Sequence, residues 1–322
     1  MGCKRTASTA DRMAVIIKVV MTVLIGMGVS EYSSVYSKRM YSDHAKISLL
    51  VLRQYLDVSY DRFSDILGSM DGVMTVAGIG DVPDPSTLRK FSVRIDPGTI
   101  KSVIRNTAKM VCGPDMIGAV DSTGFSCSSA SKHYEKRLRE MSGNKGDMSI
   151  TYSSGPVRGY CKASLAVDTN TLTVLAADIC ASNNSDVKRL PYLIDDLKGV
   201  GFSISCMTAD KGYDSEYAHR YIRENLGCVT MIPLRKTEPA RLECSKRRTR
   251  ARGFFRGLMK IFFDPEIYKK RSMVETVNSM IKRNMSDIVR GRNDVSREVE
   301  VLCRCAAHNV MRVMDLGVTG VC

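Results

Sequence analysis

Residues that build soft-metal or disulfide sites are scarce in this sequence. It holds four histidines in 322 residues, and its eleven cysteines include no C-x-x-C pair with which a zinc site would start. The closest two are Cys303 and Cys305. Scattered cysteines of this kind are typical of reduced, mostly buried thiols in a cytosolic protein. Any metal chemistry must therefore use carboxylates.

The sequence also lacks an apolar run long enough to span a bilayer. The best candidate, residues 13–27, is too short and contains Lys18, whose charge also argues against a secretory signal. Lys18, Thr22 and Gly26 recur at four-residue spacing, which predicts a buried helix with one narrow polar stripe. We therefore expect a cytoplasmic protein without a membrane partner.

Negative charge is in short supply. The chain has 48 Lys and Arg against 34 Asp and Glu, a formal net charge of +14. Such an excess indicates a polyanionic partner, with nucleic acid ahead of an anionic membrane surface. Residues 235–292 alone hold 17 basic against 6 acidic side chains, so one region carries most of the imbalance. With 44% hydrophobic residues, most of the chain is expected to fold.

The first part of the chain, residues 1–110, is predicted to be an all-helical N-terminal region and a candidate DNA-binding region. Apolar residues recur at helical spacing over 45–56 and 60–70. Residues 81–91 then offer a proline-rich turn, Ser86 as an N-cap, and a short basic helix. This pattern fits a helix-turn-helix DNA reader and a three-helix packing module equally well.

The second part, residues 111–322, is predicted to be an α/β catalytic domain. Five β-rich runs indicate strands at 116–120, 160–167, 172–179, 204–208 and 228–234. A short turn joins the second and third runs, whereas helices at 185–198 and 215–225 separate the later ones, which predicts a mixed sheet flanked by helices. A basic linker, 235–263, leads to two further helices at 265–283 and 295–314.

Two aspartates follow strands of this sheet. Asp121 comes directly after the first run and Asp210 directly after the fourth, so both carboxylates emerge at one edge if the two strands share a sheet. Hard divalent ions prefer carboxylate oxygen, and two such ions can activate a hydroxyl and stabilise a leaving oxygen in phosphoryl transfer. By itself, however, an aspartate after a strand is more often only a turn residue or a helix cap.

The helix predicted at 265–283 carries a third acid in a polar stripe. Tyr268, Arg271, Glu275 and Lys282 fall within about 60° of one another at 100° per residue. A second stripe, with Ile267, Val274, Val277 and Ile281, would pack on the sheet and leave the polar one at the edge of the core. The simpler interpretation is a solvated helix face with an Arg271–Glu275 ion pair.

These four residues carry a resemblance to a known family. Their spacing, Tyr-x₂-Arg-x₃-Glu-x₆-Lys, resembles the Y-R-E-K signature of the DDE transposases of prokaryotic insertion sequences. Residues 209–215 and 120–123 resemble the motifs around the first two catalytic acids of that family, and 82–88 resembles a turn in its helical N-terminal region. The similarity touches roughly residues 40–315.

The resemblance implies an RNase H-like fold in which Asp121, Asp210 and Glu275 are the catalytic and metal-binding residues. They would hold Mg²⁺ or Mn²⁺, in two ions, for cleavage at transposon ends and transfer of the freed 3′-hydroxyl into target DNA. Tyr268, Arg271 and Lys282 would position the DNA backbone. The implied partners are double-stranded DNA, as terminal inverted repeats and target, and a second copy in a homodimer, in a nucleoid-associated cytoplasmic setting.

Several alternatives stay open at this level. The same acids would serve an RNase H-like nuclease without strand transfer, and a non-catalytic DNA-binding derivative is a third possibility. Only about 30 residues separate Leu234 from Pro265, so the long insertion that supports a DNA-hairpin mechanism in some relatives is missing. Asp214 is either a helix cap or a metal ligand. The basic run is predicted to grip phosphates through Lys246, Arg247, Arg248 and Arg250.

Overall fold

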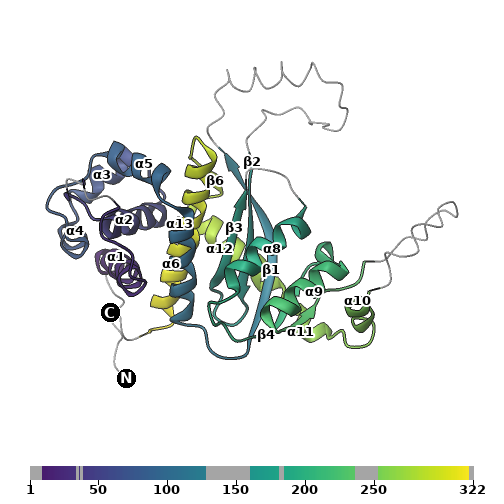
Figure 1. The fold of residues 1–322 in the computed structure, drawn as a ribbon. Coiled ribbons are helices and arrows are strands. Elements are labelled where there is room, and N and C mark those ends of the chain that lie inside the picture. The colour runs from purple at the N-terminus through teal and green to yellow at the C-terminus, as the bar shows by residue number, and fades with distance from the viewer. Residues whose placement is uncertain are drawn as a thin grey trace, which may run out of the picture.

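The structure is a computed structural model that describes residues 9–33, 36, 39–127, 160–180, 185–235 and 253–318. Its centre is a mixed sheet with strand order β3-β2-β1-β4-β5 and a short sixth strand, β6, beside β1. Helices cover both faces of the sheet, and a helical group from the start of the chain lies against one of them (Figure 1). The predicted order, a helical region followed by an α/β region, is confirmed.

Among the described residues, six helices precede the sheet. They are α1 (Thr9–Gly26), α2 (Asp43–Leu56), α3 (Tyr60–Leu67), α4 (Asp71–Ala77), α5 (Pro85–Arg94) and α6 (Pro97–Lys109). Polar caps fix several of their starts: Ser42 accepts a hydrogen bond from the Ala45 N–H and Ser59 accepts one from the Arg62 N–H. In α1 the stripe of Lys18, Thr22 and Gly26 is exposed while the rest is largely buried, as predicted.

The start of α5 corrects one prediction. Asp84, not Ser86, is the N-cap, because the Asp84 carboxylate accepts a hydrogen bond of 2.7 Å from the Ser86 N–H. Pro85 takes the first helical position, where its missing N–H is not needed and its fixed φ suits the helix. The basic residues of α5 are exposed, as expected for a solvent-facing helix.

The strands are β1 (Met116–Cys127), β2 (Tyr160–Asp168), β3 (Val174–Cys180), β4 (Ile204–Ala209), β5 (Val229–Met231) and β6 (Ile288–Val289). β1 pairs antiparallel with β2, and β2 with β3, whereas β4, β5 and β6 join in parallel. Two helices between the later strands, α8 (Asp186–Leu197) and α9 (Glu216–Leu226), supply the crossovers that parallel pairing requires. The mixed sheet is thus the one that the spacing of the runs predicted.

Strand lengths depart from the prediction where pairing decides them. β1 continues past Val120 to Cys127, because β2 pairs with it over that whole length. β3 starts at Val174 and not at 172, since Leu172 adopts a left-handed turn conformation at φ 59°. β5 is shorter than predicted, and β6 is a strand of two residues that hydrophobic patterning does not reveal.

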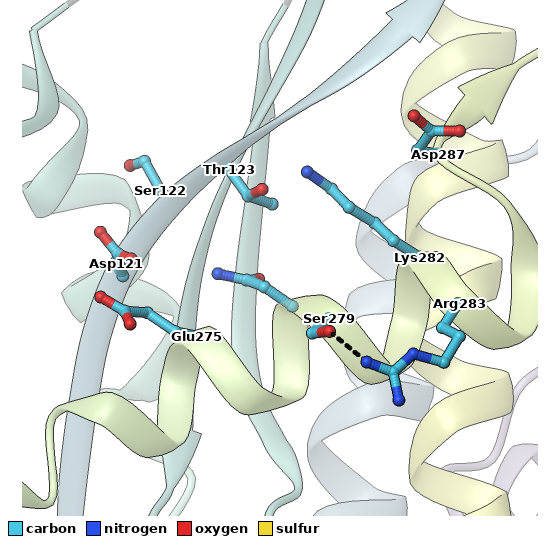
Figure 2. Close-up of a pocket in the computed structure, with 9 residues that line it drawn as sticks. Asp121, Ser122, Thr123, Glu275, Ser279, Lys282, Arg283 and Asp287 are labelled. Atoms are coloured by element: carbon cyan, nitrogen blue, oxygen red, sulfur yellow. Dashed lines mark hydrogen bonds between the residues drawn. The ribbon is translucent and has the colours of Figure 1, made fainter.

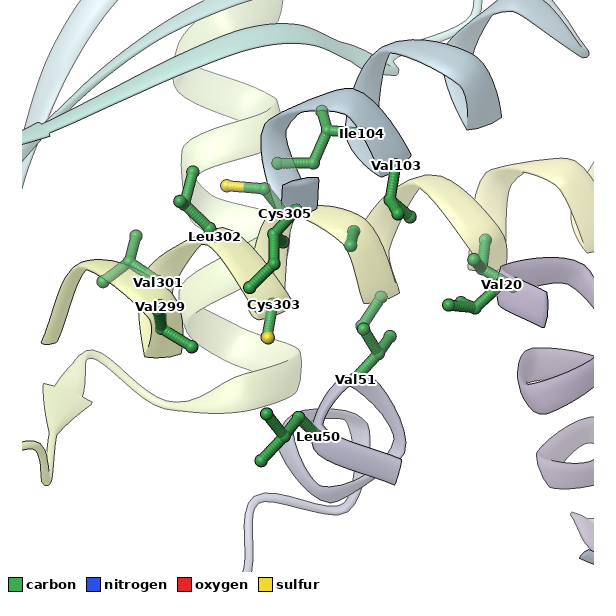
Figure 3. Packing of buried hydrophobic residues seen from close by; sticks show 14 of the residues in the cluster. Val20, Leu50, Val51, Val103, Ile104, Val299, Val301, Leu302, Cys303 and Cys305 are labelled. Atoms are coloured by element: carbon green, nitrogen blue, oxygen red, sulfur yellow. The ribbon is translucent and has the colours of Figure 1, made fainter. Parts of the chain in front are cut away.

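The last helix, α13 (Asp294–Asp315), joins the helical group to the sheet. Its buried face packs against α2, α6 and β3, and Figure 3 shows Leu50, Val51, Val103 and Ile104 around it. Among its polar residues, Asn309 accepts from the Val174 N–H and donates to the carbonyls of Ile104 and Val174. A fully bonded amide at this depth ties α6, β3 and α13 together.

The predicted helix over 265–283 is in fact two helices. α11 (Pro265–Lys269) ends before α12 (Ser272–Met285) begins. The N–H groups of Lys270 and Arg271 bond three residues back, and the Ser272 hydroxyl donates to the Lys269 carbonyl, which tightens the chain at the join. A short helix, α10 (Phe254–Leu258), also lies within the segment predicted to be a linker.

Two expectations concern the molecule as a whole. Eight cysteines lie in the described residues, all are free, and six of them are buried. Burial raises the pKa of the Cys161, Cys228 and Cys303 thiols to about 12, so these thiols behave as small apolar side chains. Within the part of the chain that the structure describes, no helix is both long and apolar enough to cross a membrane.

Candidate active site

Asp121 and Asp210 are neighbours at the end of the parallel ladder between β1 and β4. The last pair in that ladder is Val120 with Ala209, so the two aspartates are the next residues on each strand. Asp121 stays within β1, opposite Leu165 of β2, whereas Asp210 leaves the sheet. Its carbonyl accepts a hydrogen bond from the Tyr213 N–H at 2.8 Å in a short 3₁₀ turn, η1 (Lys211–Tyr213).

The pleat of β1 decides which way Asp121 faces. Successive side chains of a strand point to opposite faces, so Asp121 shares a face with Ala119 and Phe125. Ala119 and Phe125 belong to the same buried cluster as Val274 and Val277 of α12. Asp121 therefore faces α12, and the predicted apolar stripe of that helix does pack on the sheet.

Glu275 completes this side of the site. It lies on α12 with its carboxylate turned toward that of Asp121, as Figure 2 shows. Both line an open cavity of about 530 Å³, and the Glu275 side chain is 55% exposed. The other lining residues come from β1, α12 and the turn after α12: Ser122, Thr123, Asn278, Ser279, Lys282, Arg283 and Asp287.

Arg271 lies between the two carboxylates. Its guanidinium donates to Glu275 at 2.5 Å, and one of its nitrogens is 3.9 Å from the nearer oxygen of Asp121. The Arg271–Glu275 pair is the ion pair at four-residue spacing that the sequence indicated. Because the guanidinium also reaches the strand, the stripe is more than a solvated helix face.

Tyr268 and Lys282 flank this arrangement. Burial raises the pKa of the Tyr268 hydroxyl, with Asp210 adding to the effect and Arg271 opposing it, so Tyr268 lies within electrostatic reach of both. Burial lowers the pKa of Lys282, whose ammonium is 5.3 Å from the centre of the Phe125 ring. Among the described residues, Lys282 forms no ion pair and its amine is available to a ligand.

The electrostatics of Asp121 reflect an excess of negative charge. Burial is the main cause that raises the pKa of its carboxyl, and the charges of Glu275 and Asp210 raise it further. The Ser122 N–H and Arg271 act in the opposite direction. A cation placed among these oxygens would relieve the repulsion.

The donor set is suited to a hard divalent ion. All the candidate ligands are oxygens, which Mg²⁺ and Mn²⁺ prefer. The Oδ1 atom of Asn278 is buried without a hydrogen-bond partner in the described part of the chain, and Asn278 lines the same cavity as Asp121 and Glu275. In this conformation, no three Asp, Glu, His or Cys side chains of the described residues are close enough together to hold a metal. Asp121, Glu275 and Asn278 nevertheless line one cavity, and the guanidinium of Arg271 lies between the two carboxylates.

Asn278 is a site residue that sequence reasoning missed. It lies three residues after Glu275, so helical geometry brings it to nearly the same side of α12. It lies outside the Y-R-E-K pattern, which is why the resemblance does not identify it. Its spacing from Glu275 was the available signal.

Asp214 does not cap the helix that follows it, and its carboxylate is bonded to residues other than those of the cavity. Ser215 caps α9, accepting from the Ala218 N–H. The Asp214 carboxylate is fully buried and accepts two hydrogen bonds from Arg256, at 2.7 and 2.6 Å, and one from the Arg235 N–H. This carboxylate attaches α10 to the turn that follows Asp210.

Some predicted DNA contacts lie outside the described residues. They are the basic run Lys246, Arg247, Arg248 and Arg250.

Comparison with known proteins identifies the family. The model of the transposase DDE domain family matches residues 113–310, which is more than half of the chain, and the chain belongs to that family. DDE transposase domains generally use divalent metal ions. The mixed sheet, its flanking helices and the helical N-terminal region form an α/β fold, in agreement with the architecture that the resemblance implied.

No curated protein matches the chain. Among solved structures, it is similar to a cryo-EM structure of a piggyBac transposase synaptic complex with hairpin DNA, at a TM-score of 0.41 and 12% identity. That alignment covers 98% of this chain and 76% of the other. The family assignment rests on the family model.

Proposed function

We propose that this transposase cuts DNA at the ends of its transposon and joins the freed 3′-hydroxyl to target DNA. The observation that carries the proposal is that Asp121 in β1 and Asp210 after β4 are the next residues on two paired parallel strands, while Asp121 and Glu275 of α12 line one cavity. Carboxylates that lie near one another at such positions are suited to bind metal ions for phosphoryl transfer.

Asp121, Asp210 and Glu275 are the residues that would hold two Mg²⁺ or Mn²⁺ ions. Bound ions supply a Lewis acid that activates a water or hydroxyl and stabilises the leaving oxygen. Asp121 and Asp210 extend from the rigid ladder of β1 and β4, whereas Glu275 is on a helix surface and half exposed. Glu275 is therefore the acid with the greatest freedom to adjust its position.

Arg271 and Lys282 would contact the DNA backbone. Arginine matches the paired oxygens of a phosphate and a lysine offers a point charge, so both suit a non-bridging phosphate oxygen near the cut. Metal binding at Glu275 would require the guanidinium of Arg271 to release this carboxylate. A phosphate of the bound DNA would then accept the hydrogen bonds of the guanidinium. Tyr268, next to Arg271 and Asp210, would orient that phosphate.

Other parts of the proposal rest on the resemblance alone. Contacts from Lys246, Arg247, Arg248 and Arg250 to DNA, end recognition by residues 1–110, homodimeric action and an insertion-sequence origin remain predictions. A separation of 1–110 from 111–322 as domains is likewise proposed.

The cutting reaction provides the test. The purified protein is incubated with duplex DNA carrying the element's ends and with Mg²⁺ or Mn²⁺, beside Asp121→Asn and Glu275→Gln. We expect both variants to cut slower by on the order of 1,000-fold, because each 1.4 kcal/mol of lost transition-state stabilisation costs a factor of ten and metal coordination supplies several kcal/mol. DNA binding should change little.

Matched variants control for charge and folding. Asp65→Asn and Glu224→Gln remove the same groups from exposed positions that form no ion pair with the described residues, and they should cut like the parent. Cutting at the parental rate by Asp121→Asn or Glu275→Gln would refute the site. A product joined to plasmid DNA would show strand transfer, and its absence would restrict the activity to cleavage.

A further inference from the structure

A second cavity, of about 570 Å³, lies where the helical group meets the start of α13. Its walls come from the end of α2, the start of α3, the exposed side of α5, the loop after β6, and the first turns of α13. Figure 1 shows α3 and α5 at the same end of the molecule as β6. We call this cavity the cationic pocket, after its lining residues Arg53, Arg89, Lys90, Arg94, Arg290 and Arg292.

The negative charge of the cationic pocket is small and largely engaged. Of its two carboxylates, Asp61 is exposed and Glu300 is buried. Glu300 accepts hydrogen bonds from the Arg290 and Gly291 N–H groups, and from the Arg304 guanidinium at 2.9 Å. Glu300 is thus occupied in fixing the loop.

Most of the positive charge, by contrast, forms no ion pair with the described residues. Arg290 pairs with Asp57 at 2.7 Å. The remaining exposed cations form no ion pair within the described ranges: Arg89, Lys90, Arg94 and Arg292. Four cations without an ion pair around one cavity favour a ligand with several negative charges.

Arg53 gives the pocket a fixed cationic floor. Only 3% of it is exposed, and its guanidinium lies 4.0 Å from the centre of the Tyr60 ring and donates to the Val58 carbonyl. The Nε atom of Arg53 is buried without a hydrogen-bond partner in the described part of the chain. A buried donor left unpaired is costly, so a bound acceptor would stabilise it.

The position of the cationic pocket relative to Asp121 indicates the ligand. β6 pairs with the end of β1, where Cys127 is opposite Val289, and the pocket begins at the next residue of the chain. Cys127 is six residues beyond Asp121, or about 20 Å at the rise of a strand. Lys282 and Arg283 also line the cavity of Asp121 and Glu275, which we call the acidic cavity, and they lie on α12, the helix that leads to β6. Cations thus extend from the candidate active site to the pocket.

We propose that the cationic pocket binds backbone phosphates of the DNA duplex about six base pairs from the phosphate that is cut. Base pairs of duplex DNA are about 3.4 Å apart along the axis, so 20 Å corresponds to roughly six steps. The proposal rests on the proposed function, because it takes the acidic cavity as the place of cutting. Arg89, Lys90, Arg94 and Arg292 set the register of the duplex without reading its sequence.

Salt-dependent binding tests the proposal. Fluorescence anisotropy measures the affinity of the full chain for a labelled 30-base-pair duplex between 50 and 300 mM NaCl. The triple variant Arg89→Gln, Arg94→Gln, Arg292→Gln is compared with a control that loses three exposed charges without an ion pair among the described residues, Lys109→Gln, Lys188→Gln, Arg220→Gln. We expect at least about tenfold weaker binding at 100 mM salt for the pocket variant and a salt slope lower by about two to three.

The control should stay within about threefold of the parent. Equal losses in the two variants would overturn the proposal, because only net charge would then matter. A pocket variant that binds like the parent while the parent still cuts would overturn it too, and would leave the cutting proposal intact. Absence of cutting by the parent, with pocket-dependent binding retained, would instead refute the cutting proposal.

Two further arms identify the ligand and its place. A duplex with one neutral methylphosphonate linkage about six base pairs from the cut should bind the parent more weakly than the unmodified duplex does. The pocket variant should bind the two duplexes equally. Neutral linkages having no such position dependence would overturn the proposal. In the last arm, inorganic phosphate is added, and sodium chloride at equal ionic strength is the control. If phosphate alone removes the difference in DNA affinity between parent and pocket variant, the pocket is a site for free phosphate and the proposal is overturned.

Discussion

Charged side chains on the buried face of α13 are fully bonded, whereas those in the acidic cavity are not. Arg304 is fully buried on α13 and donates to Gln54, to the carbonyls of Ser286 and Ile288, and to Glu300. In the acidic cavity, Glu275 is half exposed, Arg271 is shared unequally between two acids, and the pKa of the Asp121 carboxyl is raised by burial.

This difference separates scaffold from site. Buried charges on α13 have partners in fixed positions, so they hold β6 and the end of α12 where the fold needs them. Charges in the acidic cavity are left partly uncompensated, in keeping with the proposal that metal and DNA bind there. Each of the following variants tests one side of this contrast.

The largest effect should come from Arg304→Ala. It leaves Glu300, Gln54 and two carbonyls without their buried partner, and we expect the free energy of unfolding to fall by about 5 kcal/mol, the upper end for breaking a buried pair. Urea unfolding followed by circular dichroism measures it. Arg220→Ala removes an exposed guanidinium as a control and should change stability by less than about 0.5 kcal/mol. An equally small loss in Arg304→Ala would mean that α13 is not held by this network.

Two aspartates four residues apart should behave in opposite ways. Asp214→Asn removes the buried partner of Arg256 and should lower the free energy of unfolding by about 3 kcal/mol. Its metal requirement for cutting should stay parental. Asp210→Asn should instead abolish cutting with little change in stability. If Asp214→Asn shifts the Mg²⁺ dependence of cutting in the folded protein, Asp214 belongs to the site after all.

The smallest effect concerns pH and His308. Burial lowers the pKa of this imidazole to about 4, and its Nε2–H donates to the Leu172 carbonyl while Nδ1 has no partner among the described residues. Since the unfolded pKa is about 6.5, the unfolded chain takes up the proton first. The stability that His308 contributes is complete above pH 6.5 and is lost as pH falls toward 4.

Between pH 7 and 4.5 this loss should reach about 2 to 3 kcal/mol at 1.4 kcal/mol per pH unit. Denaturant titrations of the parent and His308→Gln at both pH values isolate it, because other titrating groups contribute equally to both proteins. The parent should lose more stability than the variant by that amount. Parallel losses in the two proteins would show that His308 does not titrate in this range.

Much of the catalytic fold was predictable because periodicity and turn residues are local. The strand at 204–208 and the helices at 215–225 and 295–314 lie within about two residues of their predicted positions. The errors occur where partners decide. β1 extends because β2 pairs with it, and the helix predicted over 265–283 divides where Ser272 bonds to Lys269.

The candidate site shows the same division. Asp121, Asp210 and Glu275 were identifiable from strand ends and from the family's signature. The sequence did not reveal that Asp214 forms an ion pair with Arg256, because Arg256 is 42 residues away and helix capping was the nearest local explanation. Nor did it reveal Asn278, whose importance depends on a cavity formed with β1.

By itself, the sequence determined the order of elements, the basic character of the chain and the types of residue in the polar stripe around Glu275, since these follow from local spacing and composition. Only the tertiary structure decided that Arg271 lies between Asp121 and Glu275, and that α5 and the loop after β6 enclose one cationic pocket. Such contacts join residues up to about 200 positions apart, and their geometry depends on packing of the whole core.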